Sequence, residues 1–219
     1  MMLAIADILS TSELTDAVAA LGRSHFADGR VSAGWSARGV KNNKQADDNA
    51  ALSALREMLL ERLLQNATFS FAARPKRIIG PLFSRYRAGN TYGEHIDEPI
   101  MDGVRSDVSF TLFLSPPENY IGGELVIVTT AGEDAIKLPA GCAFVYPATT
   151  LHKVMPVTDG ERLAAVGWVR SYIRSVEHRE ILFDLEMARR EMFERHGRSA
   201  AFERVSKSAA NLMRLWCED

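Results

Sequence analysis

The chain has 219 residues, which is enough for one domain with a full hydrophobic core. Its 26 basic and 28 acidic residues give a formal net charge of −2, so no field of one sign favours nucleic acid or an anionic membrane as a partner. Two cysteines, Cys142 and Cys217, are too few for a disulfide framework, and no segment approaches the roughly 20 apolar residues of a membrane span. We therefore expect a cytoplasmic protein whose partners do not include nucleic acid or membrane, and a homo-oligomer stays open.

Two amphipathic helices are predicted in the first third of the chain. Ser10 and Glu13 form a capping box ahead of apolar residues at helical spacing up to Leu21. A second helix should start near Asp47 or Asp48 and run to about residue 65, with one stripe of leucines: Leu52, Leu55, Leu59 and Leu63. Residues 27–46, between the helices, lack periodicity. We expect them to form either a lid over the active site or a solvated surface loop.

The middle of the chain contains short alternating apolar segments that predict strands. They are Phe69/Phe71, residues 78–86, Ser109/Thr111/Phe113, and residues 125–128, 135–138, 143–146 and 162–168. Gly and Pro punctuate these seven strands, which favours an antiparallel sandwich or barrel of the jelly-roll type. Helical spacing returns at residues 176–196, and residues 200–217 are compatible with another helix. The expected fold is therefore mainly β with flanking helices: an N-terminal helical and loop segment that packs on the core (1–66), a β core (67–174) and a C-terminal helical extension (175–219).

His95, Asp97 and His152 point most directly to chemistry. Two imidazoles and one carboxylate on one side of a metal form the facial triad that holds non-haem Fe(II) and leaves coordination positions open. Residues two apart on an extended segment project to the same side, so His95 and Asp97 can reach one ion. Each residue alone has an ordinary structural explanation. Taken together, they predict that His95, Asp97 and His152 are the metal ligands and the catalytic residues.

Arg162 offers the fixed cation that such a site needs for an anionic co-substrate. Fe(II) with one carboxylate and two neutral imidazoles carries one net positive charge and Arg162 adds another, so a co-substrate with two carboxylates, a dianion, would cancel the charge of this site. Arg162 would contact the far carboxylate through its planar fork. The alternative is a surface arginine in a hairpin turn. Alternation opposes it, because Arg162, Ala164, Val166 and Trp168 share one face of the predicted strand.

Two blocks of sequence carry a family resemblance. The run Tyr86-Arg-Ala-Gly89-Asn-Thr-Tyr92-Gly-Glu-His95-Ile-Asp97 resembles the Y-x-x-G-x-x-Y-x-x-H-x-D run of prolyl-4-hydroxylase-like, 2-oxoglutarate-dependent oxygenases. Residues 152–168 look like the same family's H-x-V-x-P-V-x-x-G-x-R-x-A-x-x-x-W block. Residues 28–34, residues 40–43 and the helical tail are similar to the bacterial PKHD-type hydroxylases. The resemblance therefore covers nearly the whole chain.

The resemblance implies a double-stranded β-helix (jelly-roll, cupin-like) core that binds Fe(II) and 2-oxoglutarate, and it also implies ascorbate (vitamin C) as a reductant. It implies that the Tyr86 hydroxyl contacts the far carboxylate beside Arg162, whereas the alternative is a core tyrosine whose hydroxyl is satisfied elsewhere. The Gly122-Gly123 pair looks like the family's GGEL turn, with a structural role.

We expect a 2-oxoglutarate-dependent dioxygenase that hydroxylates an unactivated C–H bond and forms succinate and CO2. One alternative is a non-enzymatic cupin-like module that senses iron or oxygen. Another is a His/His/Asp zinc hydrolase, which leaves Arg162 and Tyr86 unexplained. A halogenase is disfavoured because Asp97 fills the position that a halide would take. The substrate stays open among peptidyl proline, a free amino acid and a small metabolite, because function belongs to the site rather than the fold.

Overall fold

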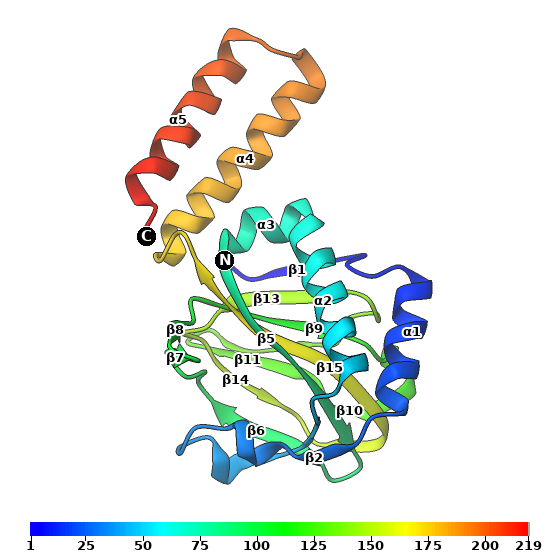
Figure 1. Ribbon diagram of the computed structural model, residues 1–219. Coiled ribbons are helices and arrows are strands. Elements are labelled where there is room, and N and C mark those ends of the chain that lie inside the picture. Colours follow the sequence, from blue (N-terminus) through cyan, green and yellow to red (C-terminus); the bar gives the residue numbers. More distant parts are fainter. Residues whose placement is uncertain (219) are drawn as a thin grey trace.

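Two antiparallel sheets face each other in the computed structural model, which describes residues 1–218 (Figure 1). The major sheet has the strand order β1-β13-β9-β15-β5-β4-β2, with β10 paired to β15. Its strands are β1 (Leu3–Ile5), β2 (Phe26–Asp28), β4 (Lys44–Ala46), β5 (Pro75–Arg87), β9 (Val108–Phe113), β10 (Tyr120–Gly122), β13 (Ala143–Pro147) and β15 (Val157–Ser171). This arrangement confirms the predicted mainly β fold with flanking helices.

The minor sheet has the order β12-β11-β14-β6-β3. Its strands are β3 (Lys41–Asn42), β6 (Thr91–His95), β11 (Leu125–Thr129), β12 (Gly132–Ile136) and β14 (Leu151–Val154). A separate hairpin joins β7 (Ile100–Met101) to β8 (Val104–Arg105). The sequence patterns did not predict β6 and β14, which are short and lack a clear alternation of apolar residues.

Helices cover the outer face of the major sheet (Figure 1). The predicted capping box is present at α1 (Thr11–Gly22), where Ser10 accepts from the Glu13 N–H and the Glu13 carboxylate accepts from the Ser10 N–H. Helix α2 (Ala50–Gln65) begins after Asn49, whose side chain accepts from the Leu52 N–H, and so starts slightly later than predicted. All four leucines of the predicted stripe are buried against the sheet.

The prediction of a strand at Phe69 and Phe71 is wrong, because these residues belong to helix α3 (Ala67–Ala73). The Asn66 side chain caps this helix by accepting from the Phe69 N–H. Phe69 is fully buried and contacts the ring of Phe110 edge-on at a centroid distance of 5.7 Å. Local capping and packing against the major sheet therefore override the apparent alternation.

The segment predicted as a loop, residues 27–46, is more regular than expected. It contains the end of β2, two short 3₁₀ turns (Gly29–Ser32 and Arg38–Val40), and strands β3 and β4. Strand β3 pairs with β6 of the minor sheet, and β4 pairs with β5 of the major sheet. The segment therefore connects the two sheets along one edge of the sandwich.

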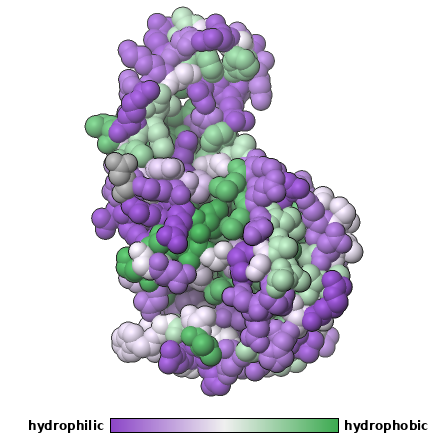
Figure 2. Space-filling model, viewed as in Figure 1, coloured by the Kyte–Doolittle hydropathy of each residue, from purple (hydrophilic) through white to green (hydrophobic). Residues whose placement is uncertain are grey.

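The C-terminal residues form a helical hairpin that projects from the sandwich (Figure 1). Its helices, α4 (Val176–His196) and α5 (Ala200–Trp216), agree with the predicted ranges. Figure 2 shows that its surface is largely hydrophilic. Within residues 1–218, none of the helices combines the length and apolar character needed to cross a bilayer.

Candidate active site

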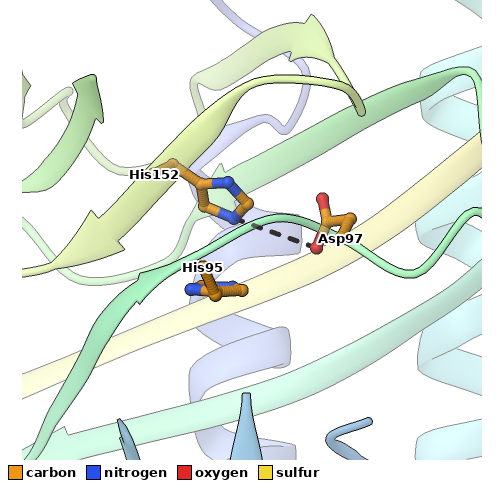
Figure 3. Close-up of side chains that lie close together, drawn as sticks. All are labelled: His95, Asp97 and His152. Carbon is orange, nitrogen blue, oxygen red and sulfur yellow. Dashed lines mark ion pairs between the residues drawn. The ribbon is translucent and has the colours of Figure 1, made fainter. Parts of the chain in front are cut away.

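His95, Asp97 and His152 lie together between the two sheets (Figure 3). His95 ends β6, and His152 lies directly opposite it on β14, so strand pairing sets the separation of the two imidazoles. Asp97 follows β6 by two residues. One ligand atom from each side chain lies within 4.8 Å of the other two, and the gap between His152 Nε2 and Asp97 Oδ1 is 3.8 Å. The three residues predicted from the sequence as a metal site are therefore neighbours in space.

Hydrogen bonds fix the orientation of both imidazoles. His95 Nδ1 lies 2.8 Å from the Gly93 carbonyl, and His152 Nδ1 lies 3.0 Å from the Thr150 carbonyl. A proton on each Nδ1 leaves both Nε2 lone pairs free for a metal, and His152 Nε2 faces Asp97. Burial, together with the neighbouring His152, lowers the pKa of His95 to about 4. The ring is therefore neutral at pH 7, as metal binding requires.

Asp97 is held by Ser109, which was not among the residues predicted for the site. Ser109, on β9 of the major sheet, donates from Oγ to Asp97 Oδ2 at 2.5 Å, while Oδ1 faces His152. Ser109 is almost completely buried. Two imidazoles and one oriented carboxylate can hold Fe(II) on one side, so the donor set fits the metal that the triad predicts.

Arg162, on β15, is 1% exposed, and its position was predicted to be inside the cavity. It lies between two aromatic rings, with the guanidinium carbon 5.1 Å from the Tyr86 centroid and 5.5 Å from the Phe113 centroid. Gly123 leaves room for it, because a Cβ there would lie 3.1 Å from Arg162 Cδ. In the described part of the chain, no carboxylate lies within ion-pairing distance of Arg162, and its Nε has no hydrogen-bond partner. A buried cation in this state is suited to an incoming anion.

Tyr86 is the direct neighbour of Arg162 across the β5–β15 pair. Burial raises the pKa of Tyr86, and the opposing effects of Arg162 and Asn43 are smaller. The phenol therefore stays protonated at neutral pH and can donate a hydrogen bond. This geometry is compatible with the role that the family resemblance implies for Tyr86.

The triad, Arg162 and Tyr86 line one cavity of about 400 Å³. Val166 and Trp168 also line it, as the predicted alternation of β15 requires, whereas Ala164 does not. Thr111 on β9 lines the cavity, and Leu112 faces the core beneath the helices. The face of β9 that carries Ser109 and Thr111 therefore borders the site, as expected, and Phe110 from the other face also belongs to the cavity lining.

The segment of residues 27–46 forms a wall of this cavity. Its lining residues are Ser32, Ala33, Gly34, Ala37, Lys41, Asn43 and Gln45. Of the two predicted alternatives, a lid and a solvated surface loop, only the lid implied a position beside the site, and Lys41 and Asn43 were not among the predicted site residues. Both are buried, whereas Asn42 between them is exposed. Closure of the segment as a lid stays a prediction.

Lys41 is a second buried cation. It lies at the end of the cavity that contains the His/His/Asp cluster, which we call the metal end. Its Nζ donates to Ser32 Oγ at 2.9 Å and lies 4.9 Å from the centroid of the Tyr92 ring, which stacks on His95. Burial lowers the pKa of Lys41 to about 8, although Asp97 and Asp28 favour its charged form. The ammonium is thus poorly compensated within the protein.

Comparisons with known proteins agree with this geometry. The family model of the 2OG-Fe(II) oxygenase superfamily matches residues 81–170, a range that contains the triad, Arg162 and Tyr86. A PKHD-type hydroxylase of Acaryochloris marina (strain MBIC 11017) is 48% identical over 219 residues, covering 100% of both chains. Another, from Synechococcus sp. (strain JA-3-3Ab), is 48% identical over 223 residues with the same coverage.

Solved structures share the fold. A prolyl-4-hydroxylase of Pseudomonas putida has a TM-score of 0.52 at 22% identity, covering 78% of this chain and 92% of its own. A Trichoplax adhaerens prolyl hydroxylase, in complex with a peptide fragment of the hypoxia inducible factor oxygen degradation domain, has a TM-score of 0.57 at 18% identity and covers 83% and 86%. HygX from Streptomyces hygroscopicus, with nickel and 2-oxoglutarate bound, has a TM-score of 0.53 at 14% identity and covers 78% and 84%. The predicted double-stranded β-helix is therefore confirmed.

The full-length relatives support a more specific assignment than the shared fold does. They match every segment of the chain, including residues 27–46, which form the N-terminal wall of the cavity, and the C-terminal hairpin. The chain belongs to the PKHD-type hydroxylases within the 2OG-Fe(II) oxygenase superfamily, and it is a dioxygenase that uses Fe(II) and 2-oxoglutarate.

Proposed function

We propose that His95, Asp97 and His152 hold the catalytic Fe(II), and that Arg162 and Tyr86 bind the far carboxylate of 2-oxoglutarate. The observation that carries this assignment is the uncompensated guanidinium of Arg162 in the same cavity as the His/His/Asp cluster. A zinc hydrolase has no need of a buried cation without a carboxylate partner in the same cavity. A co-substrate with two carboxylates needs both groups, because one carboxylate binds the metal and the other binds Arg162.

The protein residues would orient and shield the reaction. When bound, Fe(II) and 2-oxoglutarate supply the activation of dioxygen, the release of succinate and CO2, and the oxygen atom for hydroxylation. The Nδ1 hydrogen bonds of His95 and His152 hold the imidazoles in position, and Ser109 holds Asp97. Burial of Arg162 excludes water from the far carboxylate, which strengthens a charge-assisted contact.

We also propose that the primary substrate enters between the N-terminal wall of the cavity and the β7–β8 hairpin. Ile96 and Ile100 line the cavity there and are 51% and 58% exposed, so an apolar group can reach them from solvent. The Trichoplax protein is in complex with a peptide, and HygX has a structure with hygromycin B bound. A peptidyl substrate and a small molecule both stay open for this chain.

The test is the formation of succinate by purified protein supplied with Fe(II), 2-oxoglutarate and oxygen. Small-molecule and peptide fractions of a cell extract are added separately, and products that have gained one oxygen atom are sought by mass spectrometry. We expect succinate to rise with one such product. Asp97→Ala is the matched control and should form neither. A hydrolase would form no succinate, and a passive sensor would bind 2-oxoglutarate without consuming it.

A cytoplasmic location and residues 67–174 as the catalytic core are parts of the same proposal. Free thiols at Cys142 and Cys217 are compatible with a reducing compartment. Ascorbate would act only as a reductant, so turnover should begin without it.

A further inference from the structure

Asn43 is the least satisfied polar side chain beside the site. It is 2% exposed and lines the cavity, yet neither its Oδ1 nor its Nδ2 has a hydrogen-bond partner. Buried side-chain amides in folded proteins are seldom left with both atoms unpaired. Either a molecule that enters the cavity or an internal water must therefore complete this residue.

The backbone of Asn43 is held by the strands on both sides and by a hydrogen bond. Asn43 stands between β3, which belongs to the minor sheet, and β4, which belongs to the major sheet. Its carbonyl accepts from the Gly29 N–H at 2.9 Å. Gly29 also packs against the amide, since a Cβ at that position would lie 1.9 Å from Asn43 Oδ1. The absence of a side chain at Gly29 thus allows the Asn43 side chain to occupy its position between β3 and β4.

Strand register brings Asn43 next to the pair that faces the far carboxylate. Lys44 and Gln45 pair with Arg85 and Ser84, which places Asn43 at the level of Tyr86 on β5. Tyr86 in turn pairs with Arg162 on β15. Asn43 lies close enough to the Tyr86 hydroxyl to lower the pKa of that group, although no well-formed hydrogen bond joins them. The three side chains therefore form one row across the major sheet.

A carboxylate has about four lone-pair positions to fill. The two-pronged contact of an arginine takes two of them, and a phenol takes a third. The Nδ2 amide group of an asparagine in the same row can take the fourth. These groups together supply enough donors for a single carboxylate group, and the unpaired hydroxyl of Tyr120 near Arg162 is a further donor at this end.

We infer that Asn43 is a further binding residue for 2-oxoglutarate, donating from Nδ2 to the carboxylate held by Arg162 and Tyr86. This inference rests on the proposed function of those two residues. It also gives the N-terminal wall a direct contact with the co-substrate, so that residues 41–46 would be held in place once 2-oxoglutarate is bound.

The test compares two acids that differ only at the far end. 2-Oxopentanoate has the same 2-oxo acid group and chain length as 2-oxoglutarate but lacks the far carboxylate. Binding of each acid to the Fe(II)-loaded protein is measured without oxygen by calorimetry, for the wild type, Asn43→Ala and Asn42→Ala. Asn42 is the matched control, because it is exposed and donates outward to the Gly89 carbonyl at 3.0 Å.

Asn43→Ala should weaken 2-oxoglutarate about tenfold, which is the loss expected for one hydrogen bond to a charged group. Binding of 2-oxopentanoate should not change, and Asn42→Ala should bind both acids like the wild type. Asn43→Asp, which keeps the size of the side chain and adds a negative charge, should weaken 2-oxoglutarate further than Asn43→Ala does.

Equal weakening of both acids in Asn43→Ala would show a purely structural role and overturn the inference. Unchanged binding of 2-oxoglutarate in Asn43→Ala or Asn43→Asp would overturn it as well. If the wild type with Fe(II) binds neither acid, the proposed function itself fails, and the inference falls with it. If Asn43→Ala does not fold, Asn43→Asp alone decides between these outcomes.

Discussion

The minor sheet and the major sheet contribute different chemistry to the two ends of the cavity. His95 and His152 come from adjacent strands of the minor sheet, where their backbones are paired directly. Tyr86 and Arg162 come from adjacent strands of the major sheet and are paired in the same way. Each end of the cavity is thus built from a cross-strand pair, and the sandwich fold brings the two pairs face to face.

The two ends differ in how far their polar atoms are satisfied. At the metal end, both Nδ1 atoms and Asp97 Oδ2 already have protein partners, and the free atoms converge on one point. At the other end, Arg162 Nε and both amide atoms of Asn43 have none. The polar atoms of the metal end are therefore oriented by the protein itself, whereas the other end keeps buried polar atoms that are available to a ligand.

The largest expected effect is at the metal end. His95→Ala, Asp97→Ala or His152→Ala should each lower Fe(II) affinity by more than about a hundredfold and abolish turnover, because even an outer partner of a ligand is worth 10–100-fold. Asp97→Glu should also impair activity, because an added methylene displaces the carboxylate by more than the ~0.2 Å tolerance of metal coordination. Metal affinity is measured by calorimetry, and circular dichroism of the metal-free variants is the control for folding. Full activity in any one alanine variant would remove that residue from the triad.

At the carboxylate end, Arg162→Ala should weaken 2-oxoglutarate about ten- to a hundredfold while Fe(II) still binds, because a hydrogen bond to a charged group contributes ~1.5–3 kcal/mol. Arg162→Lys should recover only part of the affinity, since it keeps the charge but loses the planar fork. The apparent affinities for 2-oxoglutarate and for Fe(II) are both measured. This comparison distinguishes an effect at the carboxylate end from an effect at the metal end. An unchanged affinity for 2-oxoglutarate in Arg162→Ala would contradict the assignment.

Ser109 is an exception to this separation of the two sheets, because it lies on the major sheet but donates to Asp97 at the metal end. Ser109→Ala should lower Fe(II) affinity by about tenfold, the lower part of the range for an outer-shell partner, and leave 2-oxoglutarate affinity nearly unchanged. Ser84→Ala is a matched control, since Ser84 is equally buried, lines the same cavity and makes no hydrogen bond to Asp97 among residues 1–218. Equal metal affinities in the two variants would mean that Ser109 does not orient Asp97.

The smallest effect concerns the stability of the metal-free protein. The pKa of Lys41 falls from 10.5 to about 8 on folding, so its charged form destabilises the folded state. This destabilisation is fully present below pH 8, decreases as the pH rises from about 8 to 10.5, and is absent above that range. Lys41→Met should therefore stabilise the metal-free protein at pH 7 by on the order of 1–2 kcal/mol. This value is smaller than the full desolvation penalty of Lys41, because the variant also loses the hydrogen bond to Ser32.

Urea unfolding of the wild type and of Lys41→Met at several pH values measures this difference in free energy. The two proteins should converge in stability between pH 8 and 10.5. Lys44→Met, an exposed substitution in the same segment, should show no such convergence. A constant difference between wild type and Lys41→Met across this range would show that Lys41 is not desolvated.

The sequence by itself determined the long helices and the chemistry of the metal end. Helices α1, α2, α4 and α5 depend on local caps and on apolar residues at helical spacing, both of which are visible in the chain. The pattern of His95, Asp97, His152 and Arg162 was equally visible, because metal coordination and anion binding require particular side-chain types at restricted spacings. These features depend on residues that are close in sequence or chemically distinctive.

Only the tertiary structure decided which ordinary polar residues face the cavity. Strands β3, β6 and β14 are two to five residues long and are defined by backbone hydrogen bonds to partners far away in the sequence, so side-chain periodicity does not reveal them. Ser109, Lys41 and Asn43 are common residue types, and their roles come from burial and from the neighbours that strand pairing supplies. Desolvation and missing partners are properties of the assembled sandwich, which is why the sequence predicted the His/His/Asp cluster but not the buried polar residues beside it.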